Sequence, residues 1–126
     1  MPLLQFDTTL SLDGAETEAF AAFVRETYAD VMRTGTSHVA VTVRTHGDAA
    51  LSLGRDVEGP LLFLDAEIRR GRDDGTKREF ALAVMEHARG TFGVPEENLK
   101  VVFTEHDGPS MMGYDRVGGE WSPDEA

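Results

Sequence analysis

The second residue of the chain is a proline, and its position can give it a chemistry that other prolines lack. If Met1 is removed, the nitrogen of Pro2 becomes a secondary amine at the start of the chain. An α-amino group titrates near about 7.7–8.0, and burial or a neighbouring cation lowers that pKa. Such an amine can serve as a general base near neutral pH. Position alone leaves a second interpretation open, in which Pro2 merely follows the initiator methionine.

Three arginines, Arg69, Arg70 and Arg72, form the second group with chemical potential. A guanidinium group binds a carboxylate through two parallel hydrogen bonds, and a charge-assisted contact of this kind contributes about 1.5–3 kcal/mol. The alternative is a solvated basic turn that balances the two aspartates after it. Together with Pro2, the cluster predicts a small carboxylate substrate. The same positive charges would favour the neutral form of the Pro2 amine.

An internal repeat must position these groups. The segment 2–7, PLLQFD, matches the segment 60–65, PLLFLD, at four of six positions. Each copy begins a strand, helix and strand, so that repeat one covers about 2–46 and repeat two about 60–106. The residues that follow, about 108–121, are rich in Gly and Met and predict a small hairpin.

Local signals give the expected boundaries of the elements. The predicted strands are Pro2–Leu10, Val39–Val43 and Leu99–Thr104, a strand from Pro60 to Ile68, and a possible short strand over Leu51–Leu53. The first helix begins at Asp13, with Glu16 completing a capping box, and ends at Gly35. The second begins after Asp73 or Asp74 and ends at Gly93.

These elements predict an α+β fold in a single domain, 1–126. Two tandem β-α-β units form a four-stranded mixed sheet with both helices on one face, plus a short C-terminal hairpin. The other face is expected to carry uncovered apolar residues and therefore to meet other copies of the chain. The last residues, 122–126, are expected to fray.

Composition excludes several classes of partner. The chain has 23 acidic and 12 basic residues, a net charge of −11, which argues against nucleic acids and anionic membranes. It has no cysteine, no apolar run approaching the roughly 18 residues of a membrane span and no visible signal peptide, so we expect a cytoplasmic protein. Only two of the basic residues are lysines, and we hypothesise a halophilic source. The four histidines lack metal-binding spacing, and no metal site is expected.

The N-terminal proline, the tandem repeat and the segment Ile68–Arg72 together resemble the tautomerase superfamily in its long form. Further similarity lies in Val102–Glu105, Met111–Tyr114 and Gly119–Trp121. The sequence is most similar to the cis-3-chloroacrylic acid dehalogenase-like group, with likeness to malonate semialdehyde decarboxylase and macrophage migration inhibitory factor. The resemblance implies a homotrimer with Pro2 at the floor of each pocket, near subunit boundaries, and no cofactor or metal.

The resemblance also implies roles for individual residues. Arg69 with Arg72 matches the dehalogenase spacing for binding the substrate carboxylate, whereas Arg70 with Arg72 matches the decarboxylase spacing. The chain departs from the dehalogenase at three positions, where a glutamate, a histidine and a tyrosine are replaced by Gly113, Asp30 and Val102. Met112 and Tyr114 are further pocket candidates, although Tyr114 fits core packing equally well. Acids near enough in sequence to replace the glutamate are Glu105, Asp107 and Asp115.

Residues and resemblance together predict a tautomerase that moves a proton between carbons of a small 2-keto or 2-hydroxy unsaturated acid, with Pro2 as base. One alternative is a decarboxylase or a hydratase/dehalogenase of a three-carbon acid, in which protonated Pro2 is an acid. Another is a non-catalytic trimeric binding module.

Overall fold

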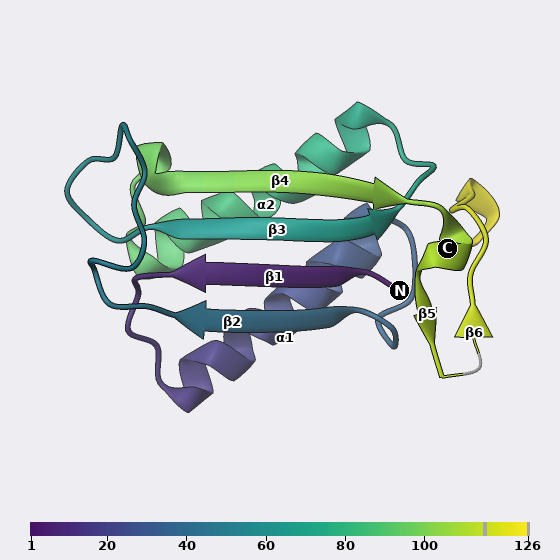
Figure 1. The fold of residues 1–126 in the computed structure, drawn as a ribbon, viewed down its shortest axis with the longest axis horizontal. Helices are drawn as coiled ribbons and strands as arrows, with labels where there is room; N and C mark the ends of the chain where they lie inside the picture. Colours follow the sequence, from purple (N-terminus) through teal and green to yellow (C-terminus); the bar gives the residue numbers. More distant parts are fainter. Residues whose placement is uncertain (115, 126) are drawn as a thin grey trace.

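A four-stranded sheet with two helices on one face forms the body of the protein (Figure 1). The computed structural model describes residues 1–114 and 116–125. The elements in chain order are β1 (Leu3–Thr8), α1 (Gly14–Val31), β2 (Ala40–Thr45), β3 (Leu62–Arg69), α2 (Asp74–Phe92), β4 (Leu99–His106), β5 (Met112–Gly113) and β6 (Arg116–Val117). None of the described helices has both the length and the apolar character needed to cross a membrane.

The order of strands in the sheet is β2-β1-β3-β4. Within each repeat the two strands are parallel, β1 with β2 and β3 with β4, whereas β1 and β3 join the repeats in antiparallel register. A separate antiparallel pair, β5 and β6, forms the small hairpin near the C-terminus. The predicted α+β fold is therefore confirmed, including its mixed sheet and terminal hairpin.

Both helices begin with the expected caps. The Asp13 carboxylate accepts the Glu16 backbone N–H at 2.7 Å, and the Glu16 side chain accepts the Asp13 N–H at 3.1 Å, which completes the capping box. Asp73 rather than Asp74 caps α2, through the Thr76 N–H at 2.8 Å. Gly93 ends α2 with a left-handed φ of 71°.

The end of α1 differs from the prediction. The helix ends at Val31, and the left-handed residue beyond it is Arg33, with φ 57°, rather than Gly35. The Thr34 N–H donates to the Ala29 carbonyl at 3.0 Å, which is the closing hydrogen bond of a Schellman motif. Met32, the C-cap residue, is fully buried. The turn also fixes the position of Thr34.

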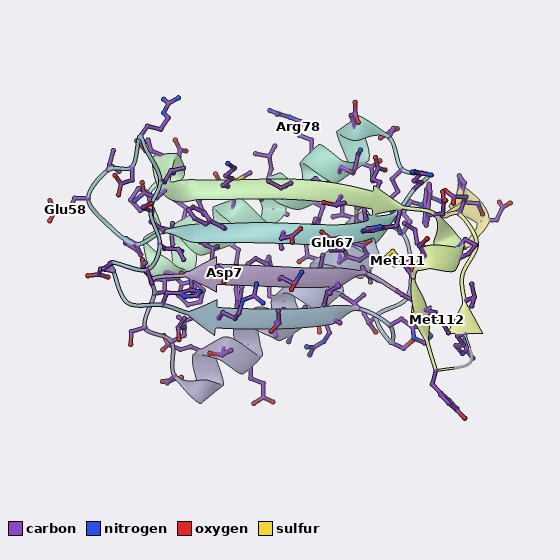
Figure 2. The ribbon with its side chains drawn as sticks, in the orientation of Figure 1. Asp7, Glu58, Glu67, Arg78, Met111 and Met112 are labelled. Atoms are coloured by element: carbon purple, nitrogen blue, oxygen red, sulfur yellow. The ribbon has the colours of Figure 1, made fainter. Side chains whose placement is uncertain are left out.

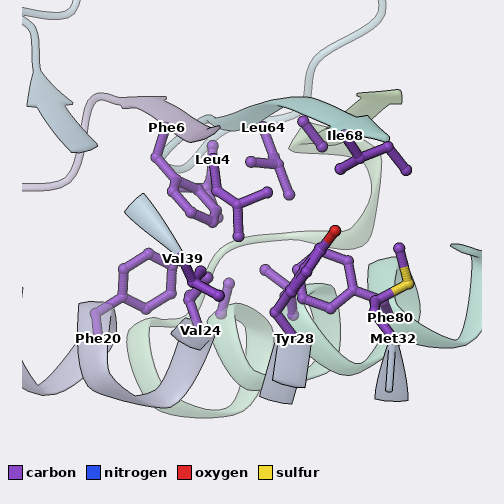
Figure 3. Packing of buried hydrophobic residues seen from close by; sticks show 14 of the residues in the cluster. Leu4, Phe6, Phe20, Val24, Tyr28, Met32, Val39, Leu64, Ile68 and Phe80 are labelled. Atoms are coloured by element: carbon purple, nitrogen blue, oxygen red, sulfur yellow. The ribbon is translucent and has the colours of Figure 1, made fainter. Parts of the chain in front are cut away.

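The core lies between the sheet and the two helices (Figure 3). Burial alternates along β3, and Leu64 and Ile68 share the covered face with Leu4 and Phe6 of β1. Aromatic rings close the layer from the helix side by edge-to-face packing, with Phe20 of α1 4.9 Å from Phe6 between ring centroids. This packing holds the two repeats, and so the ends of β1 and β3, in a fixed relation.

The open face of the sheet is more polar than the sequence predicted. Asp7 and Glu67 project from it (Figure 2), and each contacts a histidine, His46 and His106 respectively, at 2.7 Å. Arg44 also binds Asp7, and this hydrogen bond is the main reason that the pKa of Asp7 is lowered to about 2. Exposed apolar residues on this face are few, Leu3 and Val102 among them. The open face thus carries uncovered apolar residues as expected, but alternation also places charged residues on it.

Two further expectations are corrected. Leu51–Leu53 forms no strand. Where a frayed end was expected, Pro123–Glu125 forms a short 3-10 turn, and the Glu125 carboxylate makes an ion pair with Arg69. Trp121 fastens the segment to the body of the protein, since its backbone N–H donates to the Arg70 carbonyl at 3.0 Å. Ala126 lies outside the described residues.

Candidate functional site

A cavity of about 490 Å³ opens at the end of the sheet where β1 begins and β3 ends. The N-terminus, the C-terminal turn and the β5–β6 hairpin all lie at this end (Figure 1). The start of the chain, the loop after α1, the last residue of β3, strand β6 and the C-terminal turn line it. The lining residues used below are Met1, Pro2, Thr34, Arg69 and Glu125.

Pro2 is buried at this cavity and is held by the sheet. Its carbonyl accepts the Ala40 N–H at 3.0 Å, which extends the parallel pairing of β1 and β2 by one residue. The amine in the structure belongs to Met1, and burial lowers its pKa below the ordinary value of 8.0. The positive charge of Arg69 lowers this pKa further, whereas Glu125 raises it. The surroundings therefore favour a neutral amine at the start of the chain.

Arg69 is the arginine of the cluster that faces the cavity. Its side chain is mostly buried and uses both terminal nitrogens: Nη1 donates to the Gly119 carbonyl at 3.0 Å, and Nη2 donates to the Glu125 carboxylate. Because Arg69 is the last residue of β3, its backbone position is set by the sheet. The guanidinium is therefore held rigidly beside the N-terminus and is hydrogen-bonded to the Glu125 carboxylate of the same chain.

Arg72 lies behind the cavity rather than in its lining. The side chain is buried, its Nε donates to the Met32 carbonyl at 2.7 Å, and its guanidinium packs over the rings of Trp121 and Tyr28 at 4.8 and 5.5 Å. Within the described residues, Arg72 Nη1 is buried without a hydrogen-bond partner. Its charge still acts on the chain's first amine, lowering that pKa. Arg72 thus combines a packing role with an electrostatic one.

Arg70 points away from the cavity. Its exposed side chain forms an ion pair with Asp107 at the end of β4. Of the two arginine pairings implied by the sequence, the structure thus places Arg69 and Arg72 on the side of Pro2 and leaves Arg70 outside. Arg70 lies in the bend after β3, so its side chain no longer follows the alternation of the strand.

Gly113 lies next to the N-terminus. A Cβ atom added at this position would come within 3.0 Å of the Met1 Cε atom. A side chain at position 113 would therefore face the first residues of the chain, and the sequence resemblance aligns this position with the dehalogenase glutamate. In this structure the Met1 side chain lies next to that space.

The other pocket candidates lie elsewhere in the single chain. Asp30 is exposed on the outer side of α1, two residues from buried Tyr28, and Val102 is on the open face of the sheet, so neither lines this cavity. Met112 and Tyr114 are exposed on the hairpin, which excludes core packing of Tyr114 within the chain.

The acids proposed to replace the glutamate have other partners. Glu105 binds Lys77 at 3.2 Å, Asp107 binds Arg70, and Asp115 is outside the described residues. In the described part of the chain, no group of three or more His, Asp or Glu residues is placed to hold a metal ion.

Sequence reasoning missed Thr34 and Glu125. Both reach the cavity only through tertiary structure, Thr34 by the turn after α1 and Glu125 by the anchoring of Trp121. The acidic residues at the end of the chain resemble a solvated tail, and no periodic pattern marks them. The unexpected left-handed residue Arg33 is equally invisible in the sequence, because it is not a glycine.

Comparison with solved structures identifies the fold. N1, a member of the cis-3-chloroacrylic acid dehalogenase family, superposes with a TM-score of 0.85 at 21% identity, covering 98% of this chain and 87% of that chain. A malonate semialdehyde decarboxylase, FG41, inhibited by 3-bromopropiolate, gives 0.73 at 16% identity, covering 87% of each chain. A fused 4-OT protein described as a symmetric trimer gives 0.75 at 17% identity, covering 88% of this chain and 91% of that one.

No protein-family model and no curated protein sequence matches the chain. The fold likeness nevertheless extends over nearly the whole chain and includes proteins of the groups that the sequence resembles. The chain therefore has the fold of the tautomerase superfamily.

Proposed function

We propose that the protein is a cofactor-independent tautomerase of small 2-keto or 2-hydroxy unsaturated carboxylic acids, with Pro2 as general base. The observation that carries this proposal is that Pro2 and Arg69 line one cavity, where burial and the charge of Arg69 lower the pKa of the Met1 amine. Removal of Met1 would free the Pro2 nitrogen as the new terminal amine beside the same cavity. A neutral secondary amine beside a guanidinium pairs a base with a group that binds and polarises a carboxylate.

The proposed reaction is a balanced proton transfer. The neutral Pro2 nitrogen takes the proton of the enol hydroxyl of a 2-hydroxy unsaturated acid, which breaks the O–H bond. The electron pair of that bond forms the C=O bond, and the pair of the C=C bond then takes the proton back from Pro2 at a carbon atom. No atom is gained or lost, so the chemistry needs no co-reactant. Arg69 holds the substrate carboxylate and stabilises the charge that develops on the adjoining oxygen.

Decarboxylation or hydration with a protonated Pro2 is the second candidate. Glu125 favours it, because its negative charge raises the pKa of the amine in the same cavity. The fold likeness to a malonate semialdehyde decarboxylase also supports this second candidate. We rank this candidate second because burial is the largest influence on the amine, with Arg69 next, and both act to lower the pKa. Hydration also requires a base for water, and position 113 is a glycine.

We also propose that the protein works as a homotrimer. Support comes from the symmetric trimer formed by the fused 4-OT protein and from the open sheet face, which no helix covers in the described single chain. Contacts between subunits would enclose the cavity further and exclude water from it.

The decisive experiment follows two reactions with the same preparation. We expect ketonisation of phenylenolpyruvate or 2-hydroxymuconate, followed by absorbance, and little chloride release from 3-chloroacrylate, followed by NMR. Pro2→Ala should lose most of the ketonisation, since it replaces the secondary amine by a primary one. Efficient chloride release would favour the acid mechanism. Absence of both reactions, with retained carboxylate binding, would favour the non-catalytic binding module.

A further inference from the structure

The candidate carboxylate site already holds a carboxylate that belongs to the chain itself. Glu125 Oε2 accepts hydrogen bonds from Arg69 Nη2 and, at 3.1 Å, from the Thr34 hydroxyl. Arg69 and Thr34 come from the end of β3 and the turn after α1, and both line the cavity beside Pro2. A guanidinium and a hydroxyl that converge on one oxygen form the kind of site that recognises an anionic carboxylate ligand.

The segment that carries Glu125 is fastened at its base. Trp121 donates its indole N–H to the Arg33 carbonyl at 2.9 Å, and its ring lies under the Arg72 guanidinium. Gly71 permits this close approach: at its φ of 129°, an added Cβ would lie 2.5 Å from the Trp121 carbonyl oxygen. Beyond this anchor, the residues of the turn, 123–125, are exposed. The base of the segment is thus fixed, whereas the turn itself has little packing to hold it.

The groups around Glu125 keep its carboxyl group ionised. Burial acts to raise the pKa of this carboxyl group, but hydrogen bonds from Arg69 and Thr34 and the charges of Arg69 and Arg72 outweigh it, and the pKa lies below the ordinary value of 4.5. Glu125 is therefore an anion at neutral pH. Its charge raises the pKa of the N-terminal amine, as a substrate carboxylate in the same place would.

We propose that Glu125 is an internal competitor that occupies the substrate's carboxylate subsite, formed by Arg69 and Thr34, and that the turn 123–125 moves away when a carboxylate ligand binds. The inference deepens the proposed function, on which it rests for the identity of the subsite. Arg69 Nη1 is committed to the Gly119 carbonyl and Nη2 to Glu125. An incoming carboxylate that binds Nη2 and the Thr34 hydroxyl together must take the place of Glu125.

The exchange replaces one carboxylate by another, so the net charge beside Pro2 is unchanged by binding. A ligand without a carboxylate cannot replace the hydrogen bonds that Glu125 makes with Arg69 and Thr34. Such a ligand therefore does not displace Glu125 from the subsite. The apparent dissociation constant of an acid equals its intrinsic dissociation constant divided by the fraction of molecules in which the turn is open. Glu125 thus selects for anionic substrates and weakens the binding of all of them.

The test compares Glu125→Gln with Asp124→Asn, which removes the same charge from the exposed neighbour on the same turn. The ligand is crotonate, and all proteins are first checked by mass spectrometry to begin at Pro2. By calorimetry, we expect Glu125→Gln to bind crotonate about tenfold more tightly than the parent and Asp124→Asn to bind within about twofold of it. Trp121, the single tryptophan of the chain, should report the displacement as a fluorescence change in the parent that Glu125→Gln lacks.

Kinetics with phenylenolpyruvate provide the second measurement. A lower KM with unchanged kcat in Glu125→Gln agrees with competition, whereas a large loss of kcat would make Glu125 a catalytic group and overturn the proposal. Equal crotonate affinity in all three proteins, or no binding by any of them, would overturn it as well. If the affinities differ as expected but none of the proteins ketonises the enol, the result supports Glu125 as an internal competitor and contradicts the proposed tautomerase function.

Discussion

Leu3 of β1 lies opposite Glu67 of β3 in the antiparallel pairing that joins the two repeats. Continued by two residues, this register places the start of the chain beside the end of β3, where Arg69 is found. The pairing explains how a proline at position 2 and an arginine far along the chain come to line one cavity. A shift by one residue would turn Arg69 to the other face of the sheet.

Removal of Met1 is the first condition for the proposed chemistry. Met1 fills part of the cavity next to Gly113, and its presence makes the Pro2 nitrogen an amide without basicity. We expect intact-mass measurement to show that the active protein lacks Met1. A preparation that retains Met1 should be inactive until an aminopeptidase removes it. Full activity with Met1 in place would rule out Pro2 as the base.

Arg69 should matter far more than Arg70. Arg69→Gln removes the charge that faces the cavity, and we expect kcat/KM for ketonisation to fall by about 10–200-fold, as for loss of a charge-assisted contact. Arg70→Gln, which removes an exposed ion pair outside the cavity, should change kcat/KM by less than about threefold. Steady-state kinetics of both variants provide the comparison. Equal losses would mean that the carboxylate binds elsewhere.

Arg72 should contribute to stability as well as to activity. Its Nε hydrogen bond to Met32 and its packing on Trp121 are both buried, so Arg72→Leu should reduce the free energy of unfolding by about 1–3 kcal/mol. Arg78→Leu, an exposed change on α2, should cost less than about 0.5 kcal/mol. Urea denaturation measures both. Unchanged stability of Arg72→Leu would show that the buried contacts are offset by the cost of burying the charge.

The pH dependence of kcat/KM for ketonisation should show whether Pro2 acts in its neutral form. Burial and Arg69 lower the pKa of the Met1 amine, and we expect the same surroundings to lower that of Pro2 once Met1 is removed. A base mechanism then predicts that kcat/KM rises with pH through the pKa of Pro2 and stays level above it. An acid mechanism would give the opposite slope, with activity lost as pH rises through the same pKa.

Gly113→Glu tests how an added negative charge changes the pKa of the terminal amine. Position 113 faces the N-terminus, and a carboxylate there would favour the protonated amine and raise its pKa. The pH profile of ketonisation should therefore move to higher pH, with a lower rate at pH 7. Gly113→Gln, of similar size without charge, is the control. A profile that moves equally in both variants would indicate a steric effect.

The assembly should be visible by light scattering. We expect three chains of 13.8 kDa each, with the trimer strengthened by salt because each chain carries a net charge of −11. Val102→Asp, which places a charge at an exposed apolar position of the open face, should weaken the trimer, whereas Leu82→Asp on α2 should not. A monomer at every salt concentration would contradict the proposed assembly.

Local signals in the sequence predicted both helices and the four strands of the main sheet in their order. Capping residues and the glycine at the end of α2 are such signals, and the structure agrees with each of them. The repeat of PLLQFD as PLLFLD predicted two similar units, and the mixed sheet follows from joining them. The caps depend on neighbouring residues only, and the repeat is a likeness between segments 2–7 and 60–65 that can be found by comparing the sequence with itself.

Tertiary structure alone decided which charged residues meet at the cavity. Adjacent arginines look equivalent in the sequence, yet Arg69, the last residue of β3, lines the cavity, whereas Arg70, in the bend after it, pairs with Asp107. Glu125 reaches Arg69 because Trp121 anchors the end of the chain, a contact between segments about 50 residues apart that no local pattern encodes. Local preferences specify how a segment folds, whereas the partners of a side chain depend on the register and packing of distant segments.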